Sequence, residues 1–132
     1  MIVLDASAIV AALKGTDAHH QRASRILQGD RQFLAHAVTL AEVLAGGARV
    51  GRADAIRETL VGLGVAEADR VCDEAISLAR LRAESRLRLP DCCALLVAQA
   101  HGAPLATFDE RLAQVARARG VTVLDGAGSV DQ

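Results

Sequence analysis

Four acidic residues lie at positions where an α/β protein can bring side chains together for chemistry: Asp5, Glu42, Asp91 and Asp109. Asp5 directly follows an apolar run at residues 1–4, and Asp109 follows a second run at residues 104–107. Short apolar runs of this kind predict strands that are buried on both faces. Ligands bind at the carboxyl ends of strands in open α/β sheets. We therefore expect these acids to share one edge of a sheet.

Carboxylates that crowd together predict a particular chemistry. They repel one another, so some of their pKa values should rise unless a cation resolves the conflict. Mg²⁺ and Mn²⁺ prefer oxygen ligands and usually keep several waters. Such ions activate water and stabilise a leaving oxygen of a phosphate ester. The four acids together thus predict metal-dependent hydrolysis of a phosphodiester.

Each acid also has a simpler explanation. Thr39-x-x-Glu42 matches the capping box of a helix, in which the Glu side chain reaches back to the cap residue. Asp91 follows Pro90 and would be favoured there by the helix dipole. Asp109 would cap the last helix. Asp5 is the hardest to explain in this way, because a carboxylate beside a central strand is costly without a partner.

The remaining sequence alternates predicted strands with predicted helices, which favours a three-layer α/β fold with a parallel sheet of about four or five strands. Strands are expected at residues 1–4, 32–37, 64–66, 104–107 and 121–124. Helices are expected at residues 6–13, 18–27, 39–45, 52–63, 69–85, 90–100 and 110–119. Gly46-Gly47 is expected to end the third helix. The helix at residues 69–85 is expected to be the longest, with an inner face made of Val71, Cys72, Ala75, Ile76, Leu78 and Ala79.

Length and composition favour a single small domain. The chain has 132 residues, which predicts one domain at residues 1–125 and a flexible tail at residues 126–132. The hydrophobic fraction is 52% and the aromatic fraction 2%, so Ala, Val, Leu and Ile must build the core. The three cysteines give no disulfide framework and predict reduced, buried thiols in a cytoplasmic protein. No signal peptide or membrane span is expected.

Four motifs in order resemble those of PIN-domain nucleases, and their length and order most resemble VapC-type toxins of bacterial toxin–antitoxin pairs. The motifs are Val3-Leu4-Asp5-Ala6-Ser7, Thr39-Leu40-Ala41-Glu42-Val43, Leu89-Pro90-Asp91 and Leu105-Ala106-Thr107-Phe108-Asp109. The resemblance covers nearly the whole chain. It implies a Mg²⁺- or Mn²⁺-dependent endoribonuclease, usually a homodimer, that a cognate antitoxin protein holds inactive.

The same resemblance assigns roles to individual residues. The family's acidic positions fall on Asp5, Glu42, Asp91 and Asp109, of which Asp5, Asp91 and Asp109 are expected to bind the metal. Its common hydroxyl positions fall on Ser7 and Thr107. Phe108 departs from the pattern, because a polar or basic residue is frequent there, and it would alter what a substrate meets beside Asp109.

Basic residues and histidines give weaker signals. Four arginines crowd the end of the predicted long helix, Arg80, Arg82, Arg86 and Arg88. They predict either a solvated face with favourable charge at a helix end or a rim that grips RNA phosphates. The net charge of -1 does not by itself indicate nucleic-acid binding. His19 and His20 are expected to be exposed, and His36 to lie near the site at the end of the second strand.

Two other functions remain open from the sequence. An aspartyl phosphoryl-transfer enzyme would use Asp5 as its nucleophile. Dehalogenase-like phosphatases of that type have an Asp-x-Asp motif after the first strand, whereas this chain has Asp5-Ala6-Ser7. Response receivers have a lysine after a late strand, whereas the only lysine here is Lys14. A catalytically inactive PIN-like module that binds RNA or protein is the second alternative, and four retained acids weigh against it.

Overall fold

Strand β1 (Ile2–Leu4) is the centre of a five-stranded parallel sheet with the order β3-β2-β1-β4-β5. We describe this fold from a computed structural model, which covers residues 1–28 and 32–126. Neighbouring strands run in the same direction, with β1 flanked by β2 (Phe33–Ala35) and β4 (Leu105–Ala106). Strands β3 (Val65–Glu67) and β5 (Val123–Leu124) lie at the two edges. This architecture confirms the three-layer α/β fold and the parallel sheet.

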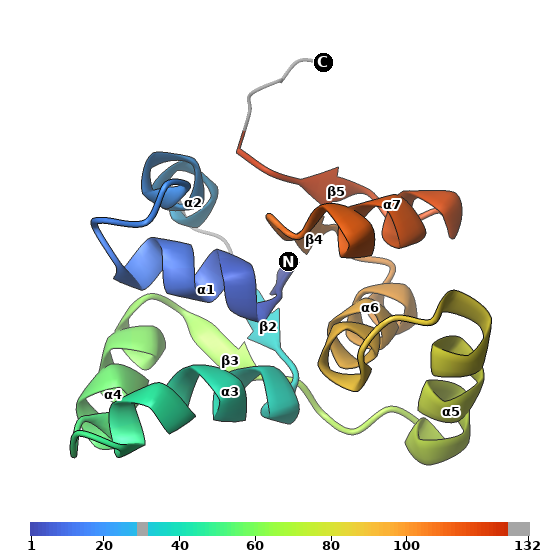
Figure 1. The fold of residues 1–132 in the computed structure, drawn as a ribbon, viewed down its shortest axis with the longest axis horizontal. Coiled ribbons are helices and arrows are strands. Elements are labelled where there is room, and N and C mark those ends of the chain that lie inside the picture. Colours follow the sequence, from blue (N-terminus) through green and yellow to red (C-terminus); the bar gives the residue numbers. More distant parts are fainter. Residues whose placement is uncertain (29–31, 127–132) are drawn as a thin grey trace.

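Helices cover both faces of the sheet (Figure 1). The described helices are α1 (Ala6–Leu13), α2 (His20–Leu27), α3 (Ala37–Ala48), α4 (Ala53–Gly62), α5 (Glu74–Ser85), α6 (Leu89–His101) and α7 (Glu110–Ala118). None of these helices is long and apolar enough to cross a membrane. The expected tail begins at Gly126, and residues 127–132 lie outside the described part of the chain.

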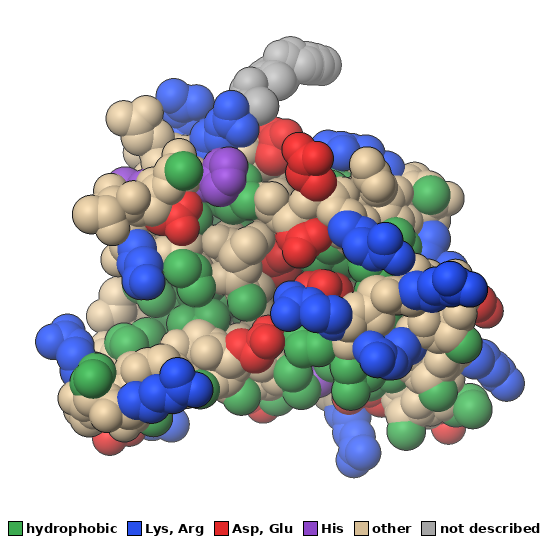
Figure 2. All heavy atoms as spheres, viewed as in Figure 1, with side chains coloured by type: hydrophobic (Ala, Val, Ile, Leu, Met, Phe, Trp, Pro, Cys, Tyr) green, Lys and Arg blue, Asp and Glu red, His purple; other side chains and the backbone are tan. Residues whose placement is uncertain are grey.

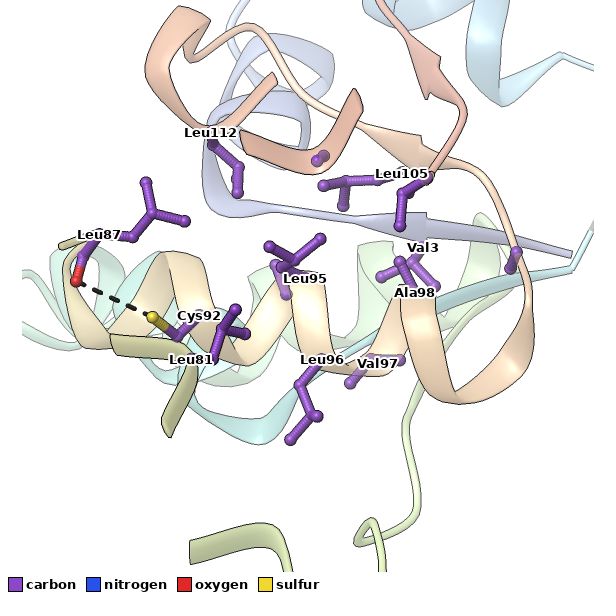
Figure 3. Packing of buried hydrophobic residues seen from close by; sticks show 14 residues of the cluster. Val3, Leu81, Leu87, Cys92, Leu95, Leu96, Val97, Ala98, Leu105 and Leu112 are labelled. Carbon is purple, nitrogen blue, oxygen red and sulfur yellow. Dashed lines mark hydrogen bonds between the residues drawn. The ribbon is translucent and has the colours of Figure 1, made fainter. Parts of the chain in front are cut away.

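The side chains of β1 alternate between two hydrophobic cores because successive residues of a strand point to opposite faces. Ile2 and Leu4 pack with the residues of α1 and β2 on one face. Val3 packs on the other face with residues from α6 and α7, among them Leu95 and Leu112. Figure 3 shows Leu95 of α6 next to Val3 and Leu105 of the sheet. Burial on both faces is what an unbroken apolar run predicts for a central parallel strand.

The predicted end of the third helix at Gly46-Gly47 is wrong. Helix α3 continues through both glycines to Ala48. Gly47 is buried, and a Cβ atom on it would collide with the Cδ1 atom of Ile56 on α4. The glycine therefore permits α3 and α4 to pack closely, and it does not end the helix.

The predicted longest helix is also wrong at its start and on its inner face. Helix α5 begins at Glu74 because Asp73 adopts a left-handed backbone conformation with φ 55°. The longest described helix is α6, with 13 residues. Four of the six residues expected on the inner face of α5 are exposed, namely Cys72, Ala75, Ile76 and Ala79. Val71 and Leu78 are partly buried against the core, and Leu81 is the buried residue of α5. Because Cys72 is exposed, the expectation of three buried thiols holds only for Cys92 and Cys93.

Candidate active site

Asp5 is a buried carboxylate at the carboxyl end of β1. Only 4% of its surface is exposed. Its backbone ends the strand and its side chain caps α1, with Oδ1 accepting a hydrogen bond from the amide of Ala8 at 2.9 Å. Two hydroxyls donate to the same carboxylate: Ser7 Oγ to Oδ1 at 2.7 Å and Thr107 Oγ1 to Oδ2 at 2.5 Å. These three donors fix the orientation of Asp5 and supply the partners that a buried carboxylate needs.

The two hydroxyls also connect Asp5 to the loop that follows β4. Ser7 Oγ accepts a hydrogen bond from the amide of Phe108 at 2.9 Å. Thr107 Oγ1 accepts one from the amide of Asp109 at 3.0 Å. Each hydroxyl therefore accepts from the β4–α7 loop and donates to Asp5. This network is possible because β1 and β4 are parallel neighbours, with Leu4 in register with Ala106, so both strands end at the same edge.

Asp109 and Asp91 stand at the starts of two further helices. Asp109 is the N-cap of α7, and its Oδ1 accepts a hydrogen bond from the amide of Leu112 at 2.9 Å. Asp91 lies in the first turn of α6. Its Oδ2 is 3.5 Å from Nε of Arg88, whose side chain is 72% exposed. Both acids therefore occupy the helix-start positions that the sequence predicts. A carboxylate has several acceptor sites, so each side chain can also bind a second partner.

Burial and neighbouring charges shift the pKa values of two of these acids, Asp5 and Asp91. Burial raises the pKa of Asp5; the hydrogen bonds from Thr107, Ala8 and Ser7 act in the opposite direction, and the charge of Asp91 raises it further. Burial also raises the pKa of Asp91, which Arg88 lowers and the charge of Asp109 raises. Asp91 therefore lies within electrostatic range of both Asp5 and Asp109. This mutual influence is the signature expected of acids that share a site.

Glu42 is placed differently from the prediction. His36, and not Thr39, caps α3, with its Nδ1 accepting a hydrogen bond from the amide of Val38 at 2.9 Å. Glu42 consequently lies in the second turn of α3, exposed, so the predicted capping box is wrong. Burial first, then the charges of nearby groups including Glu42, raise the pKa of the Cys93 thiol on α6 to about 11. Glu42 therefore lies near Cys93 of α6, and Cys93 is two residues after Asp91 in that helix.

The donor chemistry of the three aspartates suits a hard divalent cation, because all their free donor atoms are oxygen. Their arrangement is not closed around one point: among residues 1–28 and 32–126, no three His, Cys, Asp or Glu side chains are grouped to hold a metal ion. The side chain of Asp91 is turned to Arg88. Figure 2 shows acidic side chains following one another through the middle of one face, with Lys and Arg side chains on both sides. A cation would offset the repulsion that raises the pKa of Asp5 and Asp91.

The arginines at the end of α5 have mixed surroundings. Arg82 Nη1 donates to the carbonyl of Leu87 at 3.1 Å and so holds the α5–α6 loop. Arg88 contacts Asp91, while Arg80 and Arg86 are exposed. Arg88 therefore lies beside Asp91, and Arg82 stabilises the loop between α5 and α6. Binding of RNA by this cluster stays a prediction.

The histidines were the residues that the sequence placed least well. His19 and His20 are only partly exposed: His19 stacks on Phe108, and Nδ1 of His20 is 2.8 Å from the carbonyl of Ala11. Nε2 of the buried His36 is 3.2 Å from a carboxylate oxygen of Glu74. His36 therefore ties the start of α3 to the start of α5. The contacts of His19 with Phe108 and of His36 with Glu74 join elements that are distant along the chain, so no spacing in the sequence indicates them.

Comparisons with known proteins agree with this fold. Residues 2–118 match the family described as PIN domain. A toxin–antitoxin complex from Klebsiella pneumoniae contains a chain with 24% identity and a TM-score of 0.69, covering 83% of this chain and 87% of that one. The toxin VapC20 of Mycobacterium tuberculosis, described as cleaving the sarcin–ricin loop, has 18% identity and a TM-score of 0.71, covering 87% and 95%. VapBC2 from Rickettsia felis, bound to a DNA fragment from its promoter, has 16% identity and a TM-score of 0.68. The match covers 93% of this chain and 97% of that one. No curated protein matches the sequence.

Proposed function

Because the chain belongs to the PIN domain family, we propose that it is a Mg²⁺- or Mn²⁺-dependent endoribonuclease that cleaves internal phosphodiester bonds of RNA. The observation that carries the proposal is the buried Asp5 carboxylate, which Ser7 and Thr107 orient. Asp91 lies within its electrostatic range, and the amide of Asp109 donates to the same Thr107 hydroxyl. A purely structural carboxylate would not need two further acids nearby.

Asp5, Asp91 and Asp109 would hold the cation, with Glu42 at the rim as the fourth acid of the site. A bound cation supplies activation of water and stabilisation of the leaving oxygen. The protein's own groups do the positioning: Ser7 and Thr107 keep the Asp5 carboxylate in one orientation by donating to its two oxygens. Fixed carboxylates reduce the reorganisation that binding and reaction would otherwise require.

Asp5 is poorly suited to the alternative role of phosphoryl acceptor. Both of its oxygens already accept hydrogen bonds, and it is 4% exposed. A nucleophilic carboxylate must reach an incoming phosphorus atom, and each donor lowers the nucleophilicity of the oxygen that it contacts. Burial and these hydrogen bonds therefore disfavour Asp5 as a phosphoryl acceptor.

We further propose that the protein is the toxin of a type II toxin–antitoxin pair and works in the cytoplasm as a homodimer. Support comes from solved structures of similar fold, which include toxin–antitoxin complexes. An antitoxin can mask the acids by supplying an arginine to the carboxylates. Co-expression with a small protein encoded next to it should yield a stable complex without RNase activity. If the neighbour neither binds nor inhibits, the toxin role fails and the nuclease role stands on its own test.

The nuclease role is tested by incubating the purified protein with mixed structured and single-stranded RNAs, with Mg²⁺, Mn²⁺ or a chelator. Internal cleavage that requires the metal is expected. RNA binding with either metal but without cleavage would instead support the inactive module. A covalent phosphate on Asp5 would support phosphoryl transfer.

A further inference from the structure

Phe108 is the aromatic ring that stands beside the acids. The chain has two phenylalanines and neither tyrosine nor tryptophan. Phe33 is buried in the core with 1% exposure, whereas Phe108 is partly exposed between Thr107 and Asp109. The surface of this protein thus presents one large aromatic side chain, and it lies between two residues of the acid network.

A second ring lies parallel to it. The imidazole of His19 stacks on Phe108 with ring centroids 4.6 Å apart and an interplanar angle of 1°. Both rings are attached to anchored backbone. The amide of Phe108 donates to Ser7 Oγ at 2.9 Å, and the amide of His19 donates to Asp17 Oδ1 at 2.8 Å. Packing against the core accounts for part of the Phe108 surface, but it does not account for the parallel His19 ring.

The two rings border a hollow of about 270 Å³ next to the acids. Thr107 and Asp109 line it on the side of the acid network. Three more residues line it: Arg22 of α2, and Gln114 and Arg117 of α7. Both helices lie in the upper part of the view in Figure 1. The hollow therefore combines flat aromatic surface, an amide that can donate and accept, and two guanidinium groups. Glu110 and Asp125 also line it, so carboxylates stand beside the guanidinium groups.

We propose that this hollow is a nucleobase subsite, in which one unstacked base of the RNA strand packs on the His19–Phe108 pair beside the phosphodiester at the acids. The inference rests on the proposed function and extends it to substrate positioning. Sequence-tolerant recognition of single-stranded RNA uses base stacking on Phe, Tyr, Trp or His. Arg22 and Arg117 are placed to contact the phosphates on either side of that base.

A binding measurement without metal separates this inference from cleavage. The probes are a fluorescein-labelled oligoadenylate and a ribose–phosphate strand of equal length that lacks bases, both in chelator. The wild type should bind the oligoadenylate more tightly. Phe108→Leu should reduce that preference roughly 5- to 100-fold, the range that corresponds to one stacked base. His19→Leu should reduce it less, and Phe108→Trp should retain it.

Controls assign the effect to the rings. Val50→Ala changes a residue that is 71% exposed and outside the hollow, so it should leave both affinities unchanged. Arg117→Gln should weaken both strands equally and lower the salt dependence, because it removes a phosphate contact only. Circular dichroism and thermal melting should show that each variant is folded.

The outcomes distinguish the two proposals. In the cleavage assay, Phe108→Leu should raise the KM for single-stranded RNA and leave the metal requirement intact. If the wild type cleaves RNA and Phe108→Leu keeps the full base preference, the subsite is refuted and the nuclease stands. If the wild type binds neither strand, the subsite is refuted regardless of cleavage. If Phe108→Leu keeps the base preference but loses the neighbouring protein partner, the rings serve that partner and the subsite is again refuted.

Discussion

Replacing Asp91 with Asn separates a metal-site acid from an ordinary helix-start acid. Asp91 lies in the first turn of α6, as Asp54 lies in the first turn of α4, so Asp54→Asn is the matched control. A helix-start charge alone contributes about 0.3–1 kcal/mol, and Asn retains hydrogen-bonding capacity. If Asp91 did nothing else, both variants would destabilise the protein slightly and equally, with or without metal.

The surroundings of Asp91 predict a different balance. Its ion pair with Arg88 contributes at most about 1 kcal/mol, because the arginine is 72% exposed and screened by solvent. Burial and the charge of Asp109 act against ionised Asp91, and their combined effect raises its pKa in spite of Arg88. Without metal, Asp91→Asn should therefore melt at or above the wild-type temperature. The difference should stay within a few degrees, since about 1 kcal/mol shifts the Tm of a small domain by about 2–8 °C.

The pH dependence follows from the direction of the same shift. A carboxyl whose folded-state pKa is raised above its unfolded value binds more protons when folded, so stability falls as pH rises through that interval. For Asp91 the interval begins near the unfolded pKa of 3.8. The advantage of Asp91→Asn over wild type should thus be largest at neutral pH. It should disappear as the pH falls to the unfolded pKa.

Thermal melts with and without Mg²⁺ or Mn²⁺ decide between the two roles. A cation at ten times its dissociation constant should stabilise the wild type by about 1.4 kcal/mol through linkage, and Asp91→Asn by less. Asp54→Asn should gain as much as the wild type. Equal metal-induced shifts in all three proteins would refute the reasoning, as would metal-free Asp91→Asn melting far below the wild type.

Two further predictions concern stability. Thr107→Val removes a donor to Asp5 and the acceptor of a backbone amide, so urea unfolding should show a loss of about 2–4 kcal/mol; a loss below 0.5 kcal/mol would contradict the network. Gly46→Ala, whose Cβ meets nothing within 4 Å, should stabilise the protein by about 0.5–1 kcal/mol. Gly47→Ala should be less stable than Gly46→Ala, because its Cβ must displace the Cδ1 atom of Ile56. Equal effects of the two alanines in the same melts would refute the packing explanation.

The sheet and the positions of Asp5 and Asp109 after its strands could be predicted because they depend on local patterns. An apolar run that ends at Asp5, and another that ends beside Asp109, determine which residues follow parallel strands. Parallel strands share a carboxyl edge, so the two acids had to come near one another once the strands were neighbours. The hydroxyls Ser7 and Thr107 come with them, since each is two residues from one of these acids in sequence.

The errors occurred where tertiary contacts outweigh local propensity. Gly46-Gly47 resembles a helix end by propensity alone, yet α3 continues through both residues, and Gly47 lies against Ile56 of α4. Thr39-x-x-Glu42 fits a capping box, yet His36 caps the helix with one ring nitrogen and contacts Glu74 with the other. The stacking of His19 on Phe108 joins residues far apart in sequence, and a single sequence contains no signal for it.

The most direct measurement pairs Mn²⁺ titration calorimetry with RNA cleavage for single-acid variants. Asp5→Asn, Asp91→Asn and Asp109→Asn should each weaken Mn²⁺ binding and lower cleavage by orders of magnitude, while Asp54→Asn should match the wild type in both. Wild-type cleavage should vanish in chelator. Cleavage that persists in chelator, or unchanged Mn²⁺ binding in all three variants, would contradict a metal-dependent nuclease centred on Asp5.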